Sequence, residues 1–385
     1  MTTETMHLPI GGSNIARAIV CPAWISRSKK VTPRKAGSAA DLGSLLHQAM
    51  ENYYLHNQEF TTQIANTLIF SDIQLTEDHL PILWEMVRAV EYTLDLYSID
   101  EYMCEPFVTL VPGFAGGSVD MLGVSADGKT AIILDYKTGT GVVRAEDNKQ
   151  LLFYTLCATK DDKTAELLAN VDKFVGVIVQ PRLHGDLPDI WEFDRPTLDS
   201  FETIVWDTIQ EVKSSNPKSK ASTECKFCPY SPFCKDRLDY AAKAALLPPT
   251  ERNTLAKSLP LALDLKHWCD EVIAAATDYA EMGLPLRGHK LVRGRANRKW
   301  SDNSQAEAQL VQALGEGAYT KKILSPAQAI KLLRKAKQPT DSLDPLITVP
   351  LGKLTVVAES DPREVVEVEN NIKKVDKLFD SKISS

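Results

Sequence analysis

The predicted fold is decided by two adjacent segments, Gly116-Gly-Ser-Val-Asp-Met-Leu-Gly123 and Ala131-Ile-Ile-Leu-Asp-Tyr-Lys-Thr-Gly139. Alternating apolar residues in the first predict a strand over Ser118–Ser125. The second opens with a continuous apolar run, which is typical of a strand buried on both faces. Between them, Asp127-Gly128 is a strong turn signal. We therefore expect two neighbouring strands in the core of the protein.

Charged residues follow the second strand directly. Strand side chains alternate between two faces, so Asp135 and Lys137 are expected on one face and Tyr136 on the other. Asp120 lies on the strand before. Two carboxylates and a lysine at the end of a buried sheet are costly unless their charges are balanced. A bound cation would pair with both carboxylates and leave the lysine to face a phosphate or a water, so the pattern predicts a metal site.

The composition is that of a soluble globular protein, with 44% hydrophobic and 25% charged residues. A chain of 385 residues is long enough for two domains, which we place at residues 1–240 and 241–385. No signal peptide or membrane span is recognisable, so we expect a cytoplasmic protein. The net charge of −7 argues against coating of nucleic acid through bulk charge, but it leaves room for a local basic groove.

Helical and strand patterns alternate before residue 240. Helices are predicted at Ile15–Val20, Ser38–Asn57, Leu83–Tyr97, Ala145–Thr159 and Leu198–Val212, and further strands at Tyr102–Val111, Phe174–Val179 and Ile190–Phe193. This order predicts an α/β fold in three layers around a mixed sheet. The C-terminal part is expected to be mostly helical, with helices at Leu261–Met282, Ser304–Leu314 and Ser325–Lys337.

Three more residues are candidates for the site. His47 lies inside a predicted helix one turn after Gly43, a small residue that lets another group approach closely. Gln150 and Tyr154 are four residues apart, so they share one helix face near the end of the strand that carries Lys137. Each also has a structural interpretation: a core histidine, a surface glutamine and a half-buried tyrosine.

The cysteines suggest a second metal site. Cys225, Cys228 and Cys234 form a C-x2-C-x5-C triplet, and clustered cysteines in a cytosolic protein indicate metal binding. Cys21, which precedes a proline at the end of a helix, is the best fourth ligand. Four thiolates suit either zinc or a [4Fe–4S] cluster, and the spacing does not separate the two. The remaining cysteines, for which we expect packing roles, are Cys104, Cys157 and Cys269.

A basic segment follows in the C-terminal part. It runs from Arg287 to Trp300 and carries six Lys or Arg residues with no carboxylate. Contact with a phosphate backbone is one interpretation, and a solvated hairpin is the other.

Together these motifs resemble the RecB-type branch of the PD-(D/E)XK nucleases. The resemblance covers about Ser13–Arg237, with valine at position 119 where the family name has proline. The cysteines resemble those of the iron–sulfur subset of that branch, which includes the AddB subunit and the nucleases of CRISPR spacer acquisition. No helicase phosphate-binding loop is present. From Leu246 onward the chain resembles the tails of uncharacterised phage and prophage proteins.

The resemblance implies a metal-dependent DNA nuclease with a restriction-endonuclease-like core. It implies an exonuclease that acts on the ends of linear single- or double-stranded DNA in phage recombination, replication or repair, in the cytoplasm of a bacterium or infected host. A single-strand-binding or recombination protein would be its partner. A non-catalytic DNA-binding or assembly protein that retains the fold is one alternative, and a zinc-stapled interaction module is another.

The resemblance also implies a role for each site residue. His47, Asp120, Asp135 and the carbonyl of Tyr136 would hold one or two Mg²⁺ or Mn²⁺ ions. Lys137 would orient the attacking water and stabilise the phosphorane, while Gln150 and Tyr154 would position the DNA strand. The iron–sulfur cluster would be held by Cys21, Cys225, Cys228 and Cys234.

Overall fold

The computed structural model describes residues 8–31, 38–245, 252–294, 298–320, 322–336, 338–348, 354–358 and 364–366. The chain divides into two compact units, Met1–Asp264 and Leu265–Ser385. This division lies beyond residue 240, where the sequence places the domain boundary. Within the described ranges, no helix has both the length and the apolar character needed to cross a membrane.

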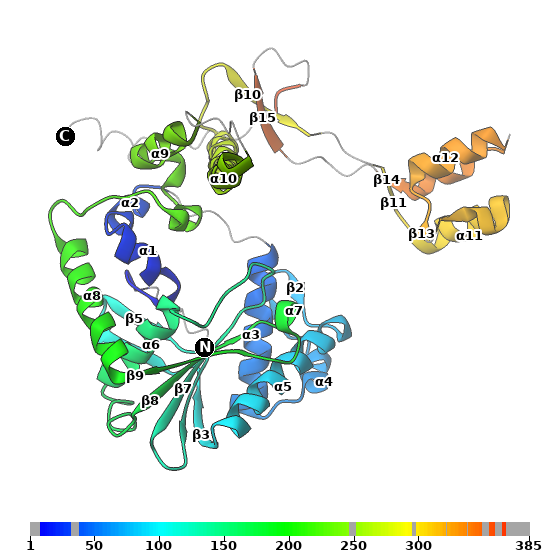
Figure 1. Ribbon diagram of the computed structural model, residues 1–385. Coiled ribbons are helices and arrows are strands. Elements are labelled where there is room, and N and C mark those ends of the chain that lie inside the picture. Colours follow the sequence, from blue (N-terminus) through cyan, green and yellow to red (C-terminus); the bar gives the residue numbers. More distant parts are fainter. Residues whose placement is uncertain are drawn as a thin grey trace. The chain divides into compact units, whose positions relative to one another are not determined.

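The core of the first unit is a five-stranded sheet with the order β3-β6-β7-β8-β9 (Figure 1). The strands are β3 (Ile99–Cys104), β6 (Met121–Ser125), β7 (Thr130–Tyr136), β8 (Lys173–Val179) and β9 (Asp189–Asp194). Neighbouring strands are antiparallel except β7 and β8, which are parallel. A parallel pair needs a crossover connection, which contains α6 (Lys149–Lys160). The expected mixed sheet is confirmed.

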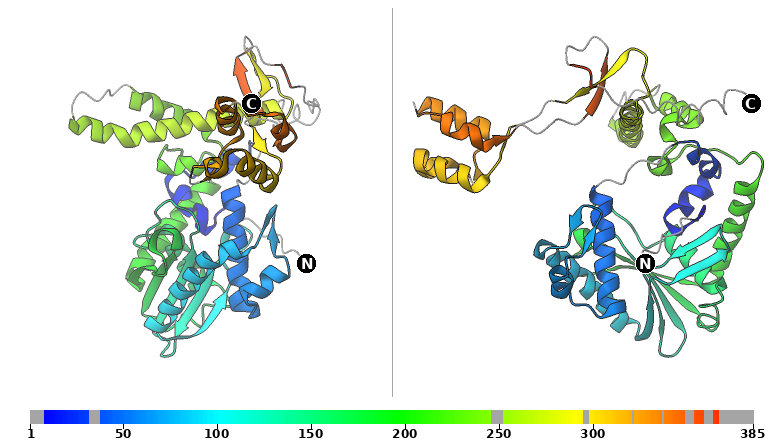
Figure 2. Two further views of the ribbon diagram at one scale, coloured as in Figure 1. Left: turned by 90° about the vertical axis from the view of Figure 1, so that its right-hand side faces the viewer. Right: turned by 180° about the vertical axis from the view of Figure 1, so that it is seen from behind.

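Helices cover both faces of this sheet, which gives the expected three layers (Figure 2). One face carries α3 (Ser38–His56) and α5 (Leu80–Leu96), and the other carries α1 (Ile15–Val20), α6 and α8 (Arg195–Lys213). Strand β7 is apolar on both sides for this reason. Ile132 and Leu134 pack in the cluster under α3 and α5, whereas Ala131 and Ile133 pack in the cluster under α6 and α8.

Short elements complete the first unit. They are α2 (Trp24–Ser28), α4 (Phe60–Ala65), β1 (Ile69–Phe70), β2 (Ile73–Gln74), α7 (Pro181–His184) and α9 (Lys235–Ala245), and α10 (Arg252–Glu281) continues into the second unit. The predicted helix α1 is confirmed with the expected ends, and α3, α5, α8 and α10 are confirmed with shifted ends. Helix α6 begins later than predicted because Asn148 caps it, its side chain accepting hydrogen bonds from the backbone NH groups of Gln150 and Leu151.

Two predicted strands are broken in the structure. The single strand expected over Tyr102–Val111 is wrong, because β3 ends at Cys104 and a separate strand, β4 (Phe107–Val111), follows. Strand β4 pairs outside the central sheet with β5 (Ala115–Ser118), so the strand expected over Ser118–Ser125 is also interrupted. The break after β3 falls at Glu105-Pro106, where Glu105 adopts a left-handed backbone with φ 51°. That conformation cannot continue a strand.

Two glycines allow close packing around the ends of the central strands. A Cβ atom at Gly12 would lie 2.3 Å from the Tyr154 ring, so only glycine lets α6 approach the chain just before α1. A Cβ atom at Gly43 of α3 would lie 2.9 Å from the Thr138 hydroxyl, just past β7. The close approach expected at Gly43 is confirmed, and it brings α3 against the end of the strand that carries Asp135.

The second unit is less helical than predicted. Helices α11 (Asn303–Leu314) and α12 (Pro326–Lys335) are confirmed, and they pack in a small buried cluster of their own. The strands that the sequence analysis missed are β10 (His289–Arg293), β11 (Lys299–Trp300), β12 (Tyr319–Thr320), β13 (Lys322–Ile323), β14 (Ile347–Thr348) and β15 (Leu354–Ala358). Their partners are often distant in sequence: β10 pairs with β15 and β11 with β14. Periodicity within one segment cannot reveal such pairing.

The basic segment therefore does not form one local hairpin. Its N-terminal half supplies β10 and its last two residues supply β11, and each strand pairs with a segment about fifty to seventy residues further on. Residues 295–297, which contain Arg295, lie outside the described residues. Phosphate contact by this segment stays a prediction.

Candidate metal centre

Strand register brings three carboxylates together where β3 ends, β6 begins and β7 ends in the central sheet. Cys104 of β3 pairs with Met121 of β6, which in turn pairs with Leu134 of β7. Glu105 follows the first of these residues, Asp120 precedes the second, and Asp135 follows the third. Because β6 is antiparallel to both neighbours, the three acids must lie side by side at the same edge. A backbone hydrogen bond of 3.1 Å from the Glu105 NH to the Asp120 carbonyl fixes this arrangement.

A histidine from α3 completes a ligand cluster. His47, Glu105 and Asp120 each offer one ligand atom, and these atoms all lie within 4.8 Å of one another. Nδ1 of His47 is 3.4 Å from Oδ1 of Asp120, and Nε2 is 3.1 Å from the carbonyl oxygen of Tyr136. The other Asp120 oxygen accepts a 2.5 Å hydrogen bond from the Tyr136 NH. These contacts orient the imidazole and the carboxylate toward the same point.

Asp135 belongs to a second, adjacent group. Its Oδ2 is 2.6 Å from Nζ of Lys137, and its Oδ1 accepts a 2.6 Å hydrogen bond from the Gln150 side chain. Lys137 also donates to Oε1 of Gln150 at 3.0 Å, which closes a ring of three side chains. The structure brings the predicted nuclease-site residues together at these strand ends, and it adds Glu105 to His47 and Asp120 in the ligand cluster. Metal ligation by Asp135 stays a prediction.

The sequence analysis did not identify Glu105. Its φ of 51° is costly for a residue with a side chain, on the order of 1–3 kcal/mol, and such strain concentrates at functional sites. Proline at position 106 disfavours a helical conformation at the preceding residue. The only signal available from sequence was therefore a Glu-Pro pair within an apparently continuous strand.

Each buried charge in this site is stabilised by an opposite charge beside it. Burial would lower the pKa of His47, but the Asp120 charge and hydrogen bond raise that pKa to about 9. Burial would likewise raise the pKa of Asp120, but His47 lowers it below its usual value. Burial also disfavours the charged form of Lys137, yet the neighbouring Asp135 raises the pKa of Lys137. Both cationic partners are therefore protonated at neutral pH.

The positive charge of His47 offsets the raised pKa of Glu105 only in part. Burial first, and then the charge of Asp120, raise the pKa of Glu105 to about 8, and Glu51 one turn after His47 adds to the effect. Burial also raises the pKa of Asp135 despite its ion pair with Lys137. A metal ligand must be deprotonated, so metal binding would displace the protons of His47 and Glu105 and leave three carboxylates facing Lys137 alone. A divalent cation would then balance the excess, and a donor set of carboxylates with one imidazole suits Mn²⁺ or Mg²⁺.

Tyr154 lies one helical turn beyond Gln150 and packs against Gly117 of β5. A Cβ atom at Gly117 would lie 3.2 Å from the Tyr154 ring, so the ring supports the backbone just before Asp120. Burial raises the pKa of the Tyr154 hydroxyl, and the negative charges of Asp135 and Asp120 add to this. The phenol therefore stays neutral, and its position supports the loop of Asp120.

The four predicted cysteine ligands line one small cavity, together with two arginines. Cys21 comes from the end of α1, whereas Cys225, Cys228 and Cys234 come from the segment before α9. Arg27 donates a 3.2 Å hydrogen bond to Sγ of Cys234. Of the other cysteines, Cys157 is buried as expected and Cys104 is partly buried, but Cys269 is exposed, so its packing role was wrongly predicted.

The spacing of these thiols bears on the metal. Bonds of about 2.3 Å in a tetrahedral zinc site place sulfurs roughly 3.8 Å apart. In the part of the chain that the structure describes, these cysteines are not among the groups that gather three ligand atoms within 4.8 Å. The choice between zinc and a [4Fe–4S] cluster therefore stays a prediction.

The sequence matches the family described as "Protein of unknown function (DUF2800)" over residues 7–364. The chain belongs to this family. Among solved structures, it is similar to the crystal structure of SSO0001, with 15% identity, a TM-score of 0.22, and coverage of 58% of this chain and 97% of that chain. It is also similar to an alkaline exonuclease (LHK-Exo) from Laribacter hongkongensis, with 16% identity, a TM-score of 0.23, and coverage of 52% and 90%.

The cluster predicts that Glu105 contributes to metal binding. Glu105→Gln keeps the shape of the side chain but removes its charge, so we expect Mn²⁺ affinity to fall by more than about tenfold. Isothermal titration of the full chain with Mn²⁺ measures this. Glu101→Gln is the matched control, because Glu101 is an exposed residue of β3, four residues before Glu105. Equal affinities for the two variants would remove Glu105 from the site.

Proposed function

We propose that the first unit is a metal-dependent deoxyribonuclease that acts on DNA ends. The observation that carries the proposal is the His47–Glu105–Asp120 cluster next to a charged lysine, Lys137, at the same edge of the sheet. Hydrolysis of a phosphodiester needs an activated water and compensation of the charge that develops on the phosphate. The ligand cluster would supply the metal that activates the water, and Lys137 would compensate the charge on the phosphate. The RecB-like motifs support DNA as the substrate and free ends as the point of attack.

Each side chain has a distinct role in this proposal. When bound, Mg²⁺ or Mn²⁺ held by His47, Glu105 and Asp120 would lower the pKa of a water and neutralise phosphate charge. Lys137, kept protonated by Asp135, would donate a hydrogen bond to a phosphate oxygen. Gln150 holds both of these side chains in place and needs no charge of its own. Tyr154 keeps the Asp120 loop in position.

The proposal extends to the biological setting that the resemblance implies. An exonuclease of this kind would act in the recombination, replication or repair of phage or bacterial DNA, with a single-strand-binding or recombination protein as partner. The second unit would contribute DNA affinity through its basic strand β10, which carries His289, Lys290 and Arg293.

Cleavage assays test the proposed activity. End-labelled linear DNA should be degraded with Mg²⁺ or Mn²⁺ and spared with EDTA, whereas covalently closed circles should stay intact. Asp135→Ala and Lys137→Ala should each lose several orders of magnitude in rate, about 4 kcal/mol or more, at unchanged melting temperature.

Lys129→Ala and Asp172→Ala are matched controls, because these residues form an exposed Lys–Asp pair at 3.3 Å. Both should keep wild-type rates. Cleavage of closed circles would show that the enzyme is an endonuclease and not an exonuclease. An intact substrate with every metal, despite DNA binding, would favour the non-catalytic alternative.

We further propose that Cys21, Cys225, Cys228 and Cys234 hold one [4Fe–4S] cluster, with zinc as the alternative. The four thiols line one cavity. The resemblance to the iron–sulfur subset of the RecB-type nucleases supports the four-iron cluster over zinc. Arg17 and Arg27, which also line the cavity, would offset the negative charge of the thiolates.

A cluster here would link the start of the first unit to the segment after its sheet. It would close a loop of about 200 residues, and loop closure of that length is worth several kcal/mol, on the order of 5. Cys21→Ser should therefore lose iron and sulfide and lower the melting temperature, while Cys269→Ser should change neither. Elemental analysis of anaerobically purified protein decides the metal. Zinc without iron would rule out the iron–sulfur cluster but would be consistent with a metal link between the two segments. Full iron content in Cys21→Ser would contradict both the role of Cys21 as a ligand and the link.

A further inference from the structure

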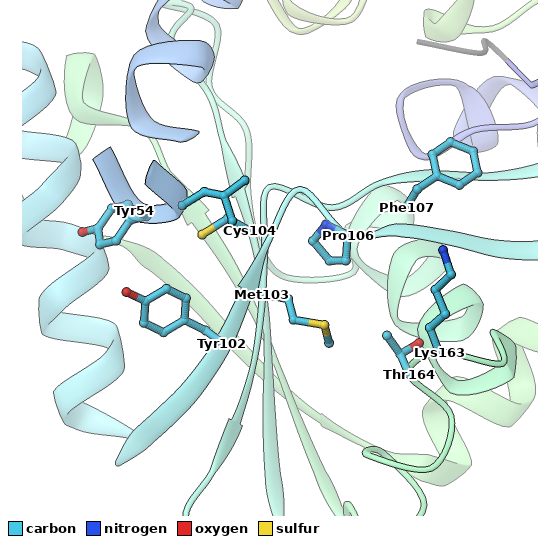
Figure 3. Close-up of a pocket in the computed structure, with 9 residues that line it drawn as sticks. Tyr54, Tyr102, Met103, Cys104, Pro106, Phe107, Lys163 and Thr164 are labelled. Carbon is cyan, nitrogen blue, oxygen red and sulfur yellow. The ribbon is translucent and has the colours of Figure 1, made fainter. Parts of the chain in front are cut away.

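We propose that a pocket beside Glu105 binds one unpaired nucleotide of the substrate, an inference that rests on the proposed nuclease function. The pocket has a volume of about 390 Å³ (Figure 3). It is lined by Tyr54, Leu55, Tyr102, Met103, Cys104, Pro106, Phe107, Lys163 and Thr164.

The position of the pocket connects it to the metal centre. Cys104 and Pro106 line the pocket, and Glu105 between them belongs to the ligand cluster. Strand β3 stands at the end of the order β3-β6-β7-β8-β9, so within the described central sheet no other strand covers its outer edge. A nucleic-acid strand whose phosphate lies at the metal centre could therefore place a neighbouring nucleotide along this edge.

The lining has the chemistry that unpaired nucleotides need. Tyr102 and Phe107 keep 39% and 38% of their surface exposed, so part of each ring is accessible to a ligand. Tyr54 and Tyr102 lie on one side of the pocket in Figure 3, and Phe107 lies on the other. Aromatic faces stack on any base, which suits an enzyme that does not read sequence.

The side of the pocket opposite the tyrosines carries a positive charge, that of Lys163, whose backbone is held by a hydrogen bond. Lys163 lies on the same side of the pocket as Phe107 and extends its amine toward it (Figure 3). Asp161 holds this wall, because its two carboxylate oxygens accept 2.9 Å hydrogen bonds from the backbone NH groups of Thr109 in β4 and of Lys163. An exposed lysine next to the ring of Phe107 is placed to bind the phosphate of a nucleotide whose base stacks on that ring.

The size and shape of the pocket select an unpaired nucleotide. Its volume is at the lower end of the roughly 300–1,000 Å³ of small-molecule sites, so it admits one nucleotide but not a duplex. In a duplex both faces of each base are covered by stacked neighbours, and the base must leave the stack before an aromatic side chain can take a face. The pocket therefore predicts a preference for single strands or frayed ends.

Binding measurements on the full chain test this proposal. In an Asp135→Ala background, which prevents cleavage, fluorescence anisotropy compares a single-stranded oligonucleotide, a blunt hairpin duplex and a strand made of abasic sites. Tyr102→Ala and Phe107→Ala should each weaken single-strand binding by about 5- to 150-fold, with a much smaller effect on the duplex. The abasic strand should bind equally to all variants, since it has no base to stack.

Two controls separate stacking from damage to the fold. Tyr102→Phe keeps the ring and should retain affinity, whereas Tyr92→Ala removes an exposed tyrosine of α5 that does not line the pocket and should change nothing. The pocket hypothesis would be overturned if single-strand affinity were the same for Tyr102→Ala, Phe107→Ala and Tyr92→Ala. The nuclease proposal would not be affected by that result. A parent chain that neither binds nor cleaves DNA would overturn both.

Discussion

Three carboxylates meet at one edge of the central sheet, and the balance of their charge governs the rest of the site. His47 offsets Asp120 and Lys137 offsets Asp135, each at short distance, while Glu105 keeps a raised pKa. Buried like charges of this kind are tolerated in proteins when a cation or a proton compensates them. Once His47 and Glu105 give up their protons as metal ligands, three carboxylates face one lysine, and this excess of negative charge is the physical reason to expect a divalent cation. The protonated lysine is the reason to expect an anionic substrate.

The local fold keeps these opposing charges together. Register between β3, β6 and β7 sets the acids side by side, and the left-handed backbone of Glu105 ends β3 at that point. Helix α3 delivers His47 because Gly43 lets it approach the end of β7, and α6 delivers Gln150 because Asn148 fixes where the helix begins. The break in the strand that positions Glu105 also opens the pocket between Cys104 and Phe107. A ligand position and a binding surface therefore share one backbone feature.

Much of this architecture could be predicted from sequence, and the exceptions have a common cause. Alternation and apolar runs predicted β7, β8 and β9, and helical periodicity predicted α3 and α5, because those patterns record burial directly. The motif residues from His47 to Tyr154 were found through a resemblance that spans them in order. Glu105 was missed because a left-handed residue inside an apolar stretch leaves no periodic signal. Strands β10 and β15 were missed because their pairing depends on segments far apart in the sequence.

Locating the bound metal tests the central claim most directly. Crystals of the protein soaked in Mn²⁺ would show the ion by its anomalous scattering. The charge balance predicts a peak within about 2.0–2.6 Å of a ligand atom from each of His47, Glu105 and Asp120, with Lys137 still paired to Asp135. A peak held by Asp135 without Glu105, or none at this edge of the sheet at millimolar Mn²⁺, would contradict it.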